Sequence, residues 1–340
     1  MKSRLAILCA AAALWGCKTT SPGGVSAIPS GTRADLAPTL EQGRQLTSLF
    51  YQGETAQLWA RMTAELRSAL GTEQNLAAFQ QQVAAQFGNE ANVLDEQAVA
   101  YPSIYLRKAA FTKGDLVLDI QWALDPNGKV AGFWVKLPEK PAASRFLDYR
   151  TKTALRLPFA GTWYTFWGGR TVEQNRHAVA VDQRFAYDFL IVNEKASHTG
   201  AGTQNSDYFA FGQAILAPGD GVVVVAEDSA MENIPGQGNA VKPLGNHVIL
   251  DHGHGEYSFL AHLKSGSVRV KSGDRVTAGM ILGLCGNTGQ STEPHLHYHL
   301  QTTPKFGDGE GLPAQFVSFI ADRREVALGE PIRGQLISAK

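Results

Sequence analysis

The chain has 340 residues, with 31 basic and 31 acidic side chains and 44% hydrophobic residues. This is a globular composition, and the length suggests about two domains. A net charge of zero without a long basic run gives no electrostatic footprint for nucleic acid, so we expect no nucleic-acid partner. The three cysteines lie at positions 9, 17 and 285, which argues against a disulfide framework.

The first residues, MKSRLAILCAAAALWGCKTT, have the layout of a secretory signal. Lys2 and Arg4 precede a short apolar stretch that ends at a small residue before Cys17. The segment LWGC resembles the bacterial lipobox, which implies that residues 1–16 are a lipoprotein signal peptide and that Cys17 carries a lipid. Lys18 resembles an outer-membrane sorting signal. We therefore expect a protein secreted across the inner membrane and anchored at the outer membrane, facing the periplasm, only through the lipid on Cys17.

Residues 17–38 predict a flexible tether, because Ser, Thr, Gly and Pro leave little apolar surface to bury. The next two segments, residues 54–71 and 72–88, repeat apolar residues three or four apart and predict two amphipathic helices. Thr72 is the expected N-cap of the second helix and Gly88 its stop. Residues 114–138 then predict a strand hairpin with its turn in the segment DPNG.

Helices followed by antiparallel strands predict a small α+β domain over residues 39–140. It resembles the helix-plus-curved-sheet domains of the nuclear-transport-factor-2-like (cystatin-like) or DUF3887 type, which often precede secreted enzymes. The segment contains no histidine and no acidic cluster at ligand spacing. We expect an accessory module for structure or substrate docking, without chemistry of its own.

Residues 156–330 consist of short apolar runs separated by Gly, Asn and Asp turns, which predicts an all-β sandwich or barrel-like domain. All nine histidines of the chain fall inside it. Cys285 lies among apolar residues and is expected to be a buried small hydrophobe rather than a nucleophile. The chemistry is therefore expected in this second domain.

The segment TEPHLHYHLQ, residues 292–301, sets three histidines at every second position. In an extended strand His295, His297 and His299 would project from one face. Neutral imidazole suits zinc and related cations. A catalytic zinc commonly keeps three protein ligands, so further ligands must come from elsewhere in the chain.

Upstream ligands are expected in the segment NRHAVAVDQRFAYDFLIV, residues 175–192. His177 begins a strand-like run, and Asp188 interrupts a second apolar run, where a carboxylate is costly unless it is paired, hydrogen-bonded or bound to a metal. Asp182 ranks second, because it lies in the connection between the two runs. His262, at the end of a β-run just before a turn, can also enter a site.

The segments GNHVILDHGHGEYSFLAHL and VKSGDRVTAGMILGLCGNTGQSTEPHLHYHL closely resemble the lysostaphin-type (LytM-type) zinc metallopeptidases, over about half of the chain. The family's signature is an upstream His and Asp, a Tyr-x-His-Leu-like segment and a glycine-rich run that ends in Pro-His-Leu-His. The resemblance implies an all-β peptidase domain that binds Zn²⁺.

Carried over position by position, the resemblance implies His177, Asp188 and His297 as metal ligands, with His262 and His295 in the two catalytic positions that do not bind the metal. The family separates its first His and Asp by three residues, whereas ten lie between His177 and Asp188. We interpret the difference as a longer hairpin connection and keep Asp188 as the ligand.

The implied reaction is hydrolysis of a peptide bond by metal-activated water. The chain has no His-Glu-x-x-His helix, so His262 and His295 must handle the proton, and the sequence does not assign the general base between them. His299 could orient one of the other two histidines of its strand. We expect His299 to be a partly exposed histidine of the strand.

The sequence thus predicts a secreted zinc endopeptidase that acts on peptidoglycan cross-links or similar Gly/Ala-rich peptides. The alternative is a catalytically inactive family member that binds peptidoglycan or activates another cell-wall hydrolase. Such members typically have lost ligands. The presence of every residue of the expected site favours the enzyme.

Overall fold

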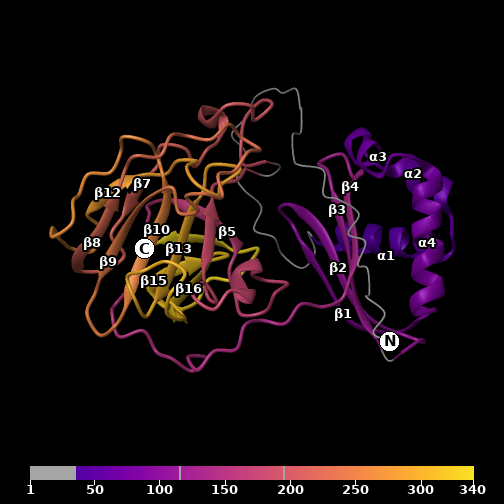
Figure 1. Ribbon diagram of the computed structural model, residues 1–340, viewed down its shortest axis with the longest axis horizontal. Coiled ribbons are helices and arrows are strands. Elements are labelled where there is room, and N and C mark those ends of the chain that lie inside the picture. The colour runs from indigo at the N-terminus through magenta and orange to yellow at the C-terminus, as the bar shows by residue number, and fades with distance from the viewer. Residues whose placement is uncertain (1–35, 115, 194–195) are drawn as a thin grey trace. The chain divides into compact units, whose positions relative to one another are not determined.

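The computed structural model describes residues 36–114, 116–193 and 196–340 of the protein (Figure 1). The expected signal peptide, the lipidation site Cys17 and nearly all of the expected tether lie outside the described residues. The chain divides into two compact units between Pro138 and Glu139. Within the described part of the chain, no helix combines the length and the hydropathy that crossing a membrane requires.

The N-terminal unit places helices against one face of an antiparallel sheet with the strand order β1-β2-β3-β4. Its helices are α1 (Ala37–Tyr51), α2 (Thr55–Arg61), α3 (Ala64–Leu70) and α4 (Glu73–Phe87), and its strands are β1 (Glu90–Val99), β2 (Ser103–Phe111), β3 (Val117–Leu124) and β4 (Val130–Lys136). The core lies between the two layers, where Trp122 stacks on Phe133 with 3.9 Å between ring centroids. Three of these elements, α1, β1 and β2, are not among those expected from the sequence.

The second predicted helix and the predicted hairpin are confirmed. Thr72 caps α4 by accepting a hydrogen bond from the amide of Asn75 at 3.2 Å, and Gly88 ends the helix with a φ of 78°. In the turn between β3 and β4, Asp125 Oδ1 accepts hydrogen bonds from the amides of Asn127 and Lys129. Local capping and turn chemistry therefore determine both features.

The single helix predicted for residues 54–71 is wrong, because the chain forms α2 and α3 with a break between them. At the break Met62 bridges to Val130, and the amide of Thr63 donates to the Val130 carbonyl at 2.9 Å. The Thr63 hydroxyl then caps α3 by accepting from the amide of Leu66. Tertiary pairing with β4 thus interrupts a helical period that continues across the break in the sequence.

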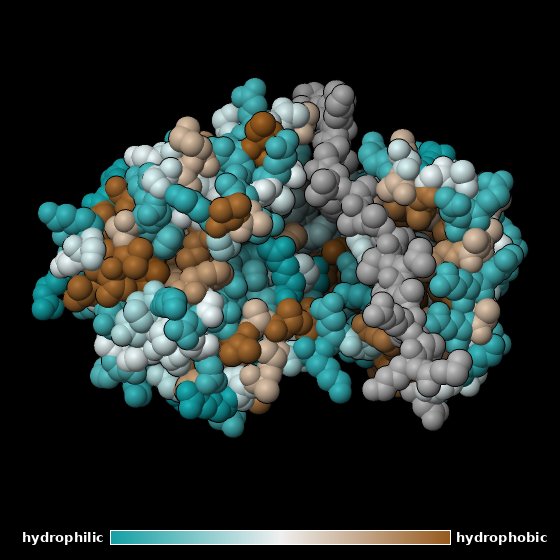
Figure 2. Space-filling view, viewed as in Figure 1, coloured by the Kyte–Doolittle hydropathy of each residue, from teal (hydrophilic) through white to brown (hydrophobic). Residues whose placement is uncertain are grey.

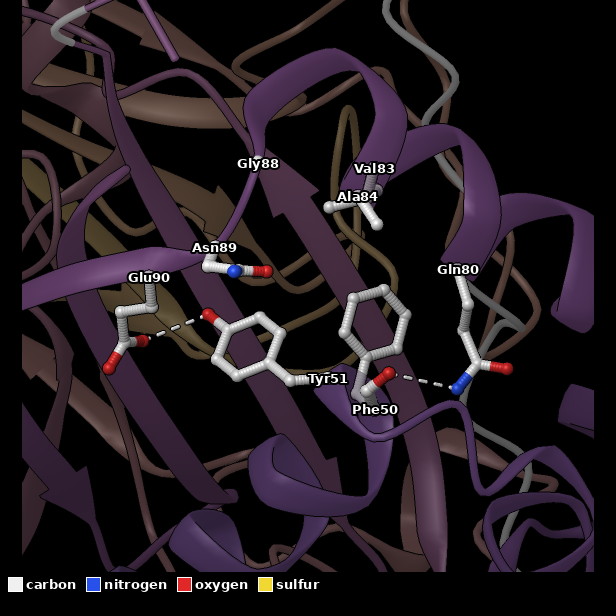
Figure 3. Close-up of a pocket in the computed structure, with 8 residues that line it drawn as sticks. All are labelled: Phe50, Tyr51, Gln80, Val83, Ala84, Gly88, Asn89 and Glu90. Carbon is white, nitrogen blue, oxygen red and sulfur yellow. Dashed lines mark hydrogen bonds between the residues drawn. The ribbon is translucent and has the colours of Figure 1, made fainter. Parts of the chain in front are cut away.

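A cavity of about 320 Å³ lies between α1, α4 and the start of β1 (Figure 3). It is lined by Phe50, Tyr51, Gln80, Val83, Ala84, Gly88, Asn89 and Glu90. The Tyr51 hydroxyl donates to Glu90 at 2.9 Å, and the Gln80 amide donates to the Phe50 carbonyl at 3.0 Å. These polar groups connect α1 to β1 and to α4, so they have a structural role.

The C-terminal unit is built from strands with two short 3₁₀ turns, which agrees with the all-β prediction. Its elements are β5 (Thr162–Trp167), η1 (Arg176–Val179), β6 (Tyr187–Leu190), η2 (Asn205–Asp207), β7 (Ala214–Leu216), β8 (Gly221–Glu227), β9 (Asn246–Asp251), β10 (Tyr257–Leu263), β11 (Arg275–Val276), β12 (Ile281–Leu284), β13 (Leu296–Gln301), β14 (Gly311–Leu312), β15 (Phe316–Ala321), β16 (Arg324–Gly329) and β17 (Leu336–Ala339). The large sheet has the order β11-β8-β9-β10-β13-β6-β5-β17-β15-β16, with β14 beside β13, and β7 pairs with β12 in a second sheet.

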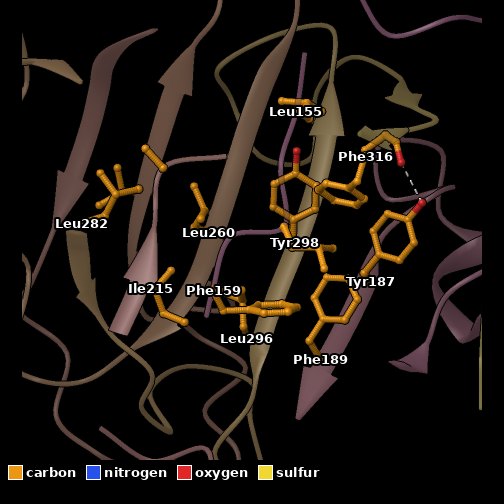
Figure 4. Packing of buried hydrophobic residues seen from close by; sticks show 14 of the residues in the cluster. Leu155, Phe159, Tyr187, Phe189, Ile215, Leu260, Leu282, Leu296, Tyr298 and Phe316 are labelled. Carbon is orange, nitrogen blue, oxygen red and sulfur yellow. Dashed lines mark hydrogen bonds between the residues drawn. The ribbon is translucent and has the colours of Figure 1, made fainter. Parts of the chain in front are cut away.

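The main core of this unit packs against one face of the large sheet (Figure 4). From β13 it takes Leu296, Tyr298 and Leu300, and from β6 it takes Tyr187 and Phe189. Since side chains alternate along a strand, the intervening residues of β6 and β13 face the other side. That side carries the candidate site.

Cys285 is fully buried in the same core, and burial raises the pKa of its thiol. The expectation of a buried small hydrophobe is confirmed.

Most of the surface in Figure 2 is hydrophilic, and apolar residues occur on it in separate patches. In the C-terminal unit, exposed apolar residues include Met231 and Ile234, in the segment between β8 and β9. The same segment is hydrogen-bonded to the loop before β13, because Asn233 Nδ2 donates to the carbonyls of Gly289 and Ser291. The β8–β9 connection therefore supports the loop that leads into the site.

Candidate metal centre

Asp188 and His297 occupy paired positions on the neighbouring antiparallel strands β6 and β13. Paired residues share a face of the sheet, so both side chains point away from the main core. His297 Nδ1 lies 2.9 Å from Asp188 Oδ1. The strand predicted around Asp188 is confirmed, and its carboxylate has the close partner that its burial demands.

His177 reaches the same carboxylate from outside the sheet. The strand-like run predicted to begin at His177 is wrong, because the residue lies in the 3₁₀ turn η1. Buried Asn175 fixes this turn, since its Oδ1 accepts from the His177 amide and its Nδ2 donates to the carbonyl of Ala186, next to β6. As a result His177 Nε2 lies 3.0 Å from Asp188 Oδ2.

The three side chains bring donor atoms together in a set suited to zinc. Within the described ranges, His177, Asp188 and His297 form a group of potential ligands whose donor atoms all lie within 4.8 Å of one another. Tetrahedral zinc with bonds of about 2.0–2.1 Å separates neighbouring donors by roughly 3.3 Å, close to the 2.9 Å and 3.0 Å contacts that Asp188 makes with His297 and His177. Two imidazoles and a carboxylate also match the nitrogen and oxygen ligands of catalytic zinc. The residues therefore fit the metal.

Asp188 is ionised in this environment. Burial alone would raise its pKa, but the nearby His177 and His295 and the close contacts of its oxygens with His177 and His297 hold the pKa of this carboxyl well below its ordinary value. Half-exposed Arg176 also places Nη2 3.3 Å from Asp188 Oδ2. The carboxylate is therefore held in its anionic form, which is the form that binds a cation.

Asp182, the second candidate for the carboxylate ligand, lies elsewhere. Its Oδ2 accepts a hydrogen bond from the amide of Gly307 at 3.0 Å. It is not a member of the ligand group.

A β-bulge places His262 beside the ligands. β10 pairs regularly with β9 up to Leu260, and the register then shifts before Leu263 returns to the core. The extra residue lets His262 face the site, with a φ of 62°. Its ring centroid lies 4.7 Å from that of His295 and 5.8 Å from that of His297.

His262 and His295 have the same orientation with respect to the backbone. Nδ1 of His262 faces the carbonyl of Thr288 at 2.8 Å, and Nδ1 of His295 faces the carbonyl of Glu293 at 2.8 Å. A carbonyl oxygen only accepts, so each Nδ1 carries a proton, and a ring without a second proton keeps a lone pair on Nε2. Two rings thus offer proton-accepting nitrogens next to the ligand group.

Nε2 of His295 is buried, has no hydrogen-bond partner among the described residues, and lies 3.7 Å from Asp188 Oδ1. Such an atom indicates a missing ligand or water. For His262, burial and the neighbouring His295 and His297 hold the pKa well below its ordinary value, so the ring is neutral at neutral pH.

His299 is not partly exposed, and that expectation is wrong. The ring is fully buried and stacks on Phe259 with 4.3 Å between centroids. Its Nδ1 lies 3.0 Å from His297 Nε2. Burial and the neighbouring His297 hold the pKa of His299 well below its ordinary value. The residue thus contacts a candidate ligand directly.

Three residues that support the site were not identified from the sequence: Asn175, Thr288 and Gln301. Asn175 positions the His177 turn, and the carbonyl of Thr288 orients His262. Gln301 Oε1 lies 3.2 Å from His299 Nε2. Asn at the start of a turn is a readable capping signal, but the other two act through tertiary contacts that no local pattern marks.

Comparison with known proteins adds to this geometry. The family model "Peptidase family M23" matches residues 201–308, which include His262, His295 and His297 but not His177 or Asp188. The structure brings the two upstream residues to the matched segment.

The chain is 36% identical over 89 residues to the peptidoglycan DD-endopeptidase ShyA of Vibrio cholerae, covering 26% of this chain and 17% of that protein. It is 44% identical over 59 residues to the glycyl-glycine endopeptidase ALE-1 of Staphylococcus capitis, covering 17% of this chain and 16% of that protein. Less than a fifth of either relative is therefore matched. The solved catalytic domain of lysostaphin from Staphylococcus simulans is 22% identical, over 45% of this chain and 89% of that one, with a TM-score of 0.29. From the family match and these sequence relatives, the C-terminal unit contains a LytM-type peptidase domain of family M23.

Proposed function

We propose that the C-terminal unit is a zinc-dependent endopeptidase that hydrolyses peptide bonds of peptidoglycan cross-links or similar Gly/Ala-rich peptides. The observation that carries the proposal is the convergence of His177, Asp188 and His297 on one point, beside the unpartnered Nε2 of His295. The matched family supports a peptidase.

His177, Asp188 and His297 would hold the zinc, which when bound polarises a carbonyl oxygen and lowers the pKa of water to about 7. His262 and His295 present Nε2 lone pairs that can take up the proton released when water attacks the peptide carbonyl. Once protonated, either ring becomes a donor for the oxyanion or for the leaving nitrogen. The carbonyls of Thr288 and Glu293 keep the two rings in place through the cycle.

The substrate class is extended from the two relatives. ShyA is named a peptidoglycan DD-endopeptidase and ALE-1 a glycyl-glycine endopeptidase, so the names support a cell-wall peptide in one case and a glycine-containing bond in the other. The two names describe different bonds. We therefore propose the class of short cell-wall peptides of small residues and leave the bond to experiment.

The experiment is digestion of purified sacculi with the full chain, with and without a zinc chelator, followed by mass analysis of the released fragments. We expect chelator-sensitive release of peptide fragments, restored by added zinc, and no release by His297→Ala. The fragment masses name the bond. Release by zinc-free protein, or equal release by His297→Ala, would show that this centre is not the catalyst.

The alternative is an inactive peptidoglycan-binding protein or an activator of another hydrolase. It is less well supported, because His177, Asp188, His262, His295 and His297 are all present and adjacent. In the same assay it requires that zinc-loaded protein binds sacculi but releases no fragment unless a second hydrolase is added.

For the location, we propose a lipoprotein of the outer membrane that faces the periplasm, with the lipid on Cys17. The support is the sequence MKSRLAILCAAAALWGC and the following Lys18. Mass analysis of the mature amino terminus tests this. A lipidated Cys17 is expected, and an unmodified residue at any other position would rule out the anchor.

A further inference from the structure

A chain of side-chain contacts runs from the candidate metal centre into the protein. His297 Nε2 lies 3.0 Å from His299 Nδ1, and His299 Nε2 lies 3.2 Å from Gln301 Oε1. All three side chains are buried. The neighbouring protein groups, rather than solvent, therefore determine which atom donates in each contact.

The hydrogen bonds of Gln301, the last residue in this series of contacts, determine which atom donates in each contact. Gln301 Nε2 lies near three backbone carbonyl oxygens, those of Thr303 at 2.7 Å, Lys305 at 2.9 Å and Asp308 at 3.1 Å. Carbonyl oxygens only accept, so the amide nitrogen must occupy this position and Gln301 Oε1 must face His299. An oxygen at that place requires a proton on His299 Nε2.

The donor and acceptor roles of His299 determine those of His297, the candidate ligand. A neutral His299 that carries its proton on Nε2 has a lone pair on Nδ1, and this lone pair accepts a hydrogen bond from His297 Nε2. A neutral His297 with its proton on Nε2 presents an unprotonated Nδ1 to Asp188 Oδ1, 2.9 Å away. Two acceptors at that distance need a positive charge between them, which a bound metal ion supplies or, without one, a proton.

The His299 ring cannot easily rotate to exchange its donor and acceptor nitrogens. It stacks on Phe259 with an interplanar angle of 18°, and it is fully buried. A flipped or alternative ring state would leave a buried donor facing a donor or an acceptor facing an acceptor.

We propose that His299 and Gln301 are positioning residues that fix the tautomer of His297, so that Nδ1 is free to bind the metal. Hydrogen-bond partners of this kind orient metal-binding imidazoles and raise their basicity. The inference rests on the proposed function for the identity of the metal, but the proton positions in the two rings follow from the hydrogen bonds of Gln301 alone.

Three variants of the full chain test the proposal. His299→Leu removes the acceptor for His297 and keeps an apolar side chain in the space. His299→Gln restores an acceptor oxygen. Gln315→Leu is the matched control: Gln315 is also a buried glutamine, whose amide donates to the Tyr149 carbonyl and accepts from the Thr151 amide, outside the site.

Zinc affinity is measured by competition with a chromophoric chelator. We expect His299→Leu to weaken zinc binding roughly 10- to 100-fold, the range typical of such partners. His299→Gln should recover most of the loss, and Gln315→Leu should bind zinc like the wild type even if it is less stable. Equal affinity in wild type and His299→Leu, or equal loss in Gln315→Leu, would overturn the proposal.

Nitrogen-15 NMR of the histidine rings provides a second readout that does not depend on activity. In zinc-loaded wild type, we expect metal-bound Nδ1 and protonated Nε2 for His297, and protonated Nε2 for His299. Protonated Nδ1 on His299 would overturn the proposal. If the wild type held no zinc, the proposed function would fail, and the tautomer of His299 in the metal-free protein would still decide the inference.

Discussion

Asp188 and His297 face each other across the β6–β13 pair, with 2.9 Å between Oδ1 and Nδ1. Two of the three candidate ligands therefore take their relative position from backbone hydrogen bonds between central strands. His177 alone arrives from a turn, which Asn175 holds against the chain that leads into β6. Strand pairing thus positions two of the ligands, and the hydrogen bonds of Asn175 position the third.

The identity of the carboxylate ligand is tested by Asp188→Asn. We expect this variant to lose more than roughly 100-fold in zinc affinity, since even partners outside the coordination shell commonly contribute 10- to 100-fold. The readout is metal content after dialysis, together with chelator competition. Asp182→Asn is the matched control and should keep zinc, because Asp182 accepts from the Gly307 amide and is not part of the ligand group. The reverse result would make Asp182 the ligand.

The two histidines outside the ligand group should affect turnover rather than metal binding. We expect His262→Ala and His295→Ala to lower kcat by roughly 10²- to 10⁴-fold, the usual contribution of general acid–base catalysis. Both should retain stoichiometric zinc, as measured by metal analysis. Exposed His254 is the control, and His254→Ala should be fully active. Loss of zinc in either site variant would instead make that residue a ligand.

The buried histidines should make the metal-free protein sensitive to acid. Burial is the first cause that lowers the pKa of His262 and His299 well below its ordinary value and that of His297 to about 4. The unfolded rings bind protons near pH ~6.5, while the folded rings do not, so unfolding takes up protons between these limits. The contribution of these neutral rings to the free energy of unfolding is therefore complete above pH ~6.5. It falls as the pH drops toward the folded pKa values, by up to about 1.4 kcal/mol per pH unit for each histidine.

Urea unfolding of chelator-treated protein across this pH range provides the measurement. His299→Leu has one buried histidine fewer, so its stability should depend less steeply on pH. A free energy of unfolding that is flat between pH ~6.5 and ~4 would contradict the assignment.

The loop that orients His262 depends on a glycine. Gly289 has a φ of 77°, and a Cβ there would lie 2.3 Å from the amide nitrogen of Gly245. Gly289→Ala should therefore cost about 1–3 kcal/mol in overpacking in addition to backbone strain, and should displace the adjacent Thr288 carbonyl. Gly273→Ala is the control, because Gly273 also has a positive φ but a Cβ there would meet no atom within 4 Å. Urea unfolding and activity assays should separate the two, and equal effects would show that strain alone matters.

The sequence predicts those parts of the fold that depend on local chemistry. The helix between Thr72 and Gly88 is confirmed because its caps are local, and the hairpin is confirmed because Asp125 makes the turn bonds expected of it. The helix break at Met62 was not predictable, because it results from pairing with a strand more than sixty residues further along the chain.

The candidate site shows the same limit. Alternation in β13 predicts that His297 and His299 share a face, and the cost of burying Asp188 predicts a partner. Neither pattern predicts the 3₁₀ turn of His177 or the complete burial of His299. The turn is held by a local cap from Asn175 together with its bond to the Ala186 carbonyl, and the burial of His299 depends on Phe259, which contacts it only in the folded chain.

The bulge at His262 has a consequence for the evolution of stability in this unit. A non-glycine residue with a φ of 62° lies in a region that costs free energy, and this conformation aims the ring at the ligands. Replacement by glycine would relieve that strain and abolish the ring's chemistry at the same time. At this position, selection for thermal stability and selection for turnover therefore act in opposite directions.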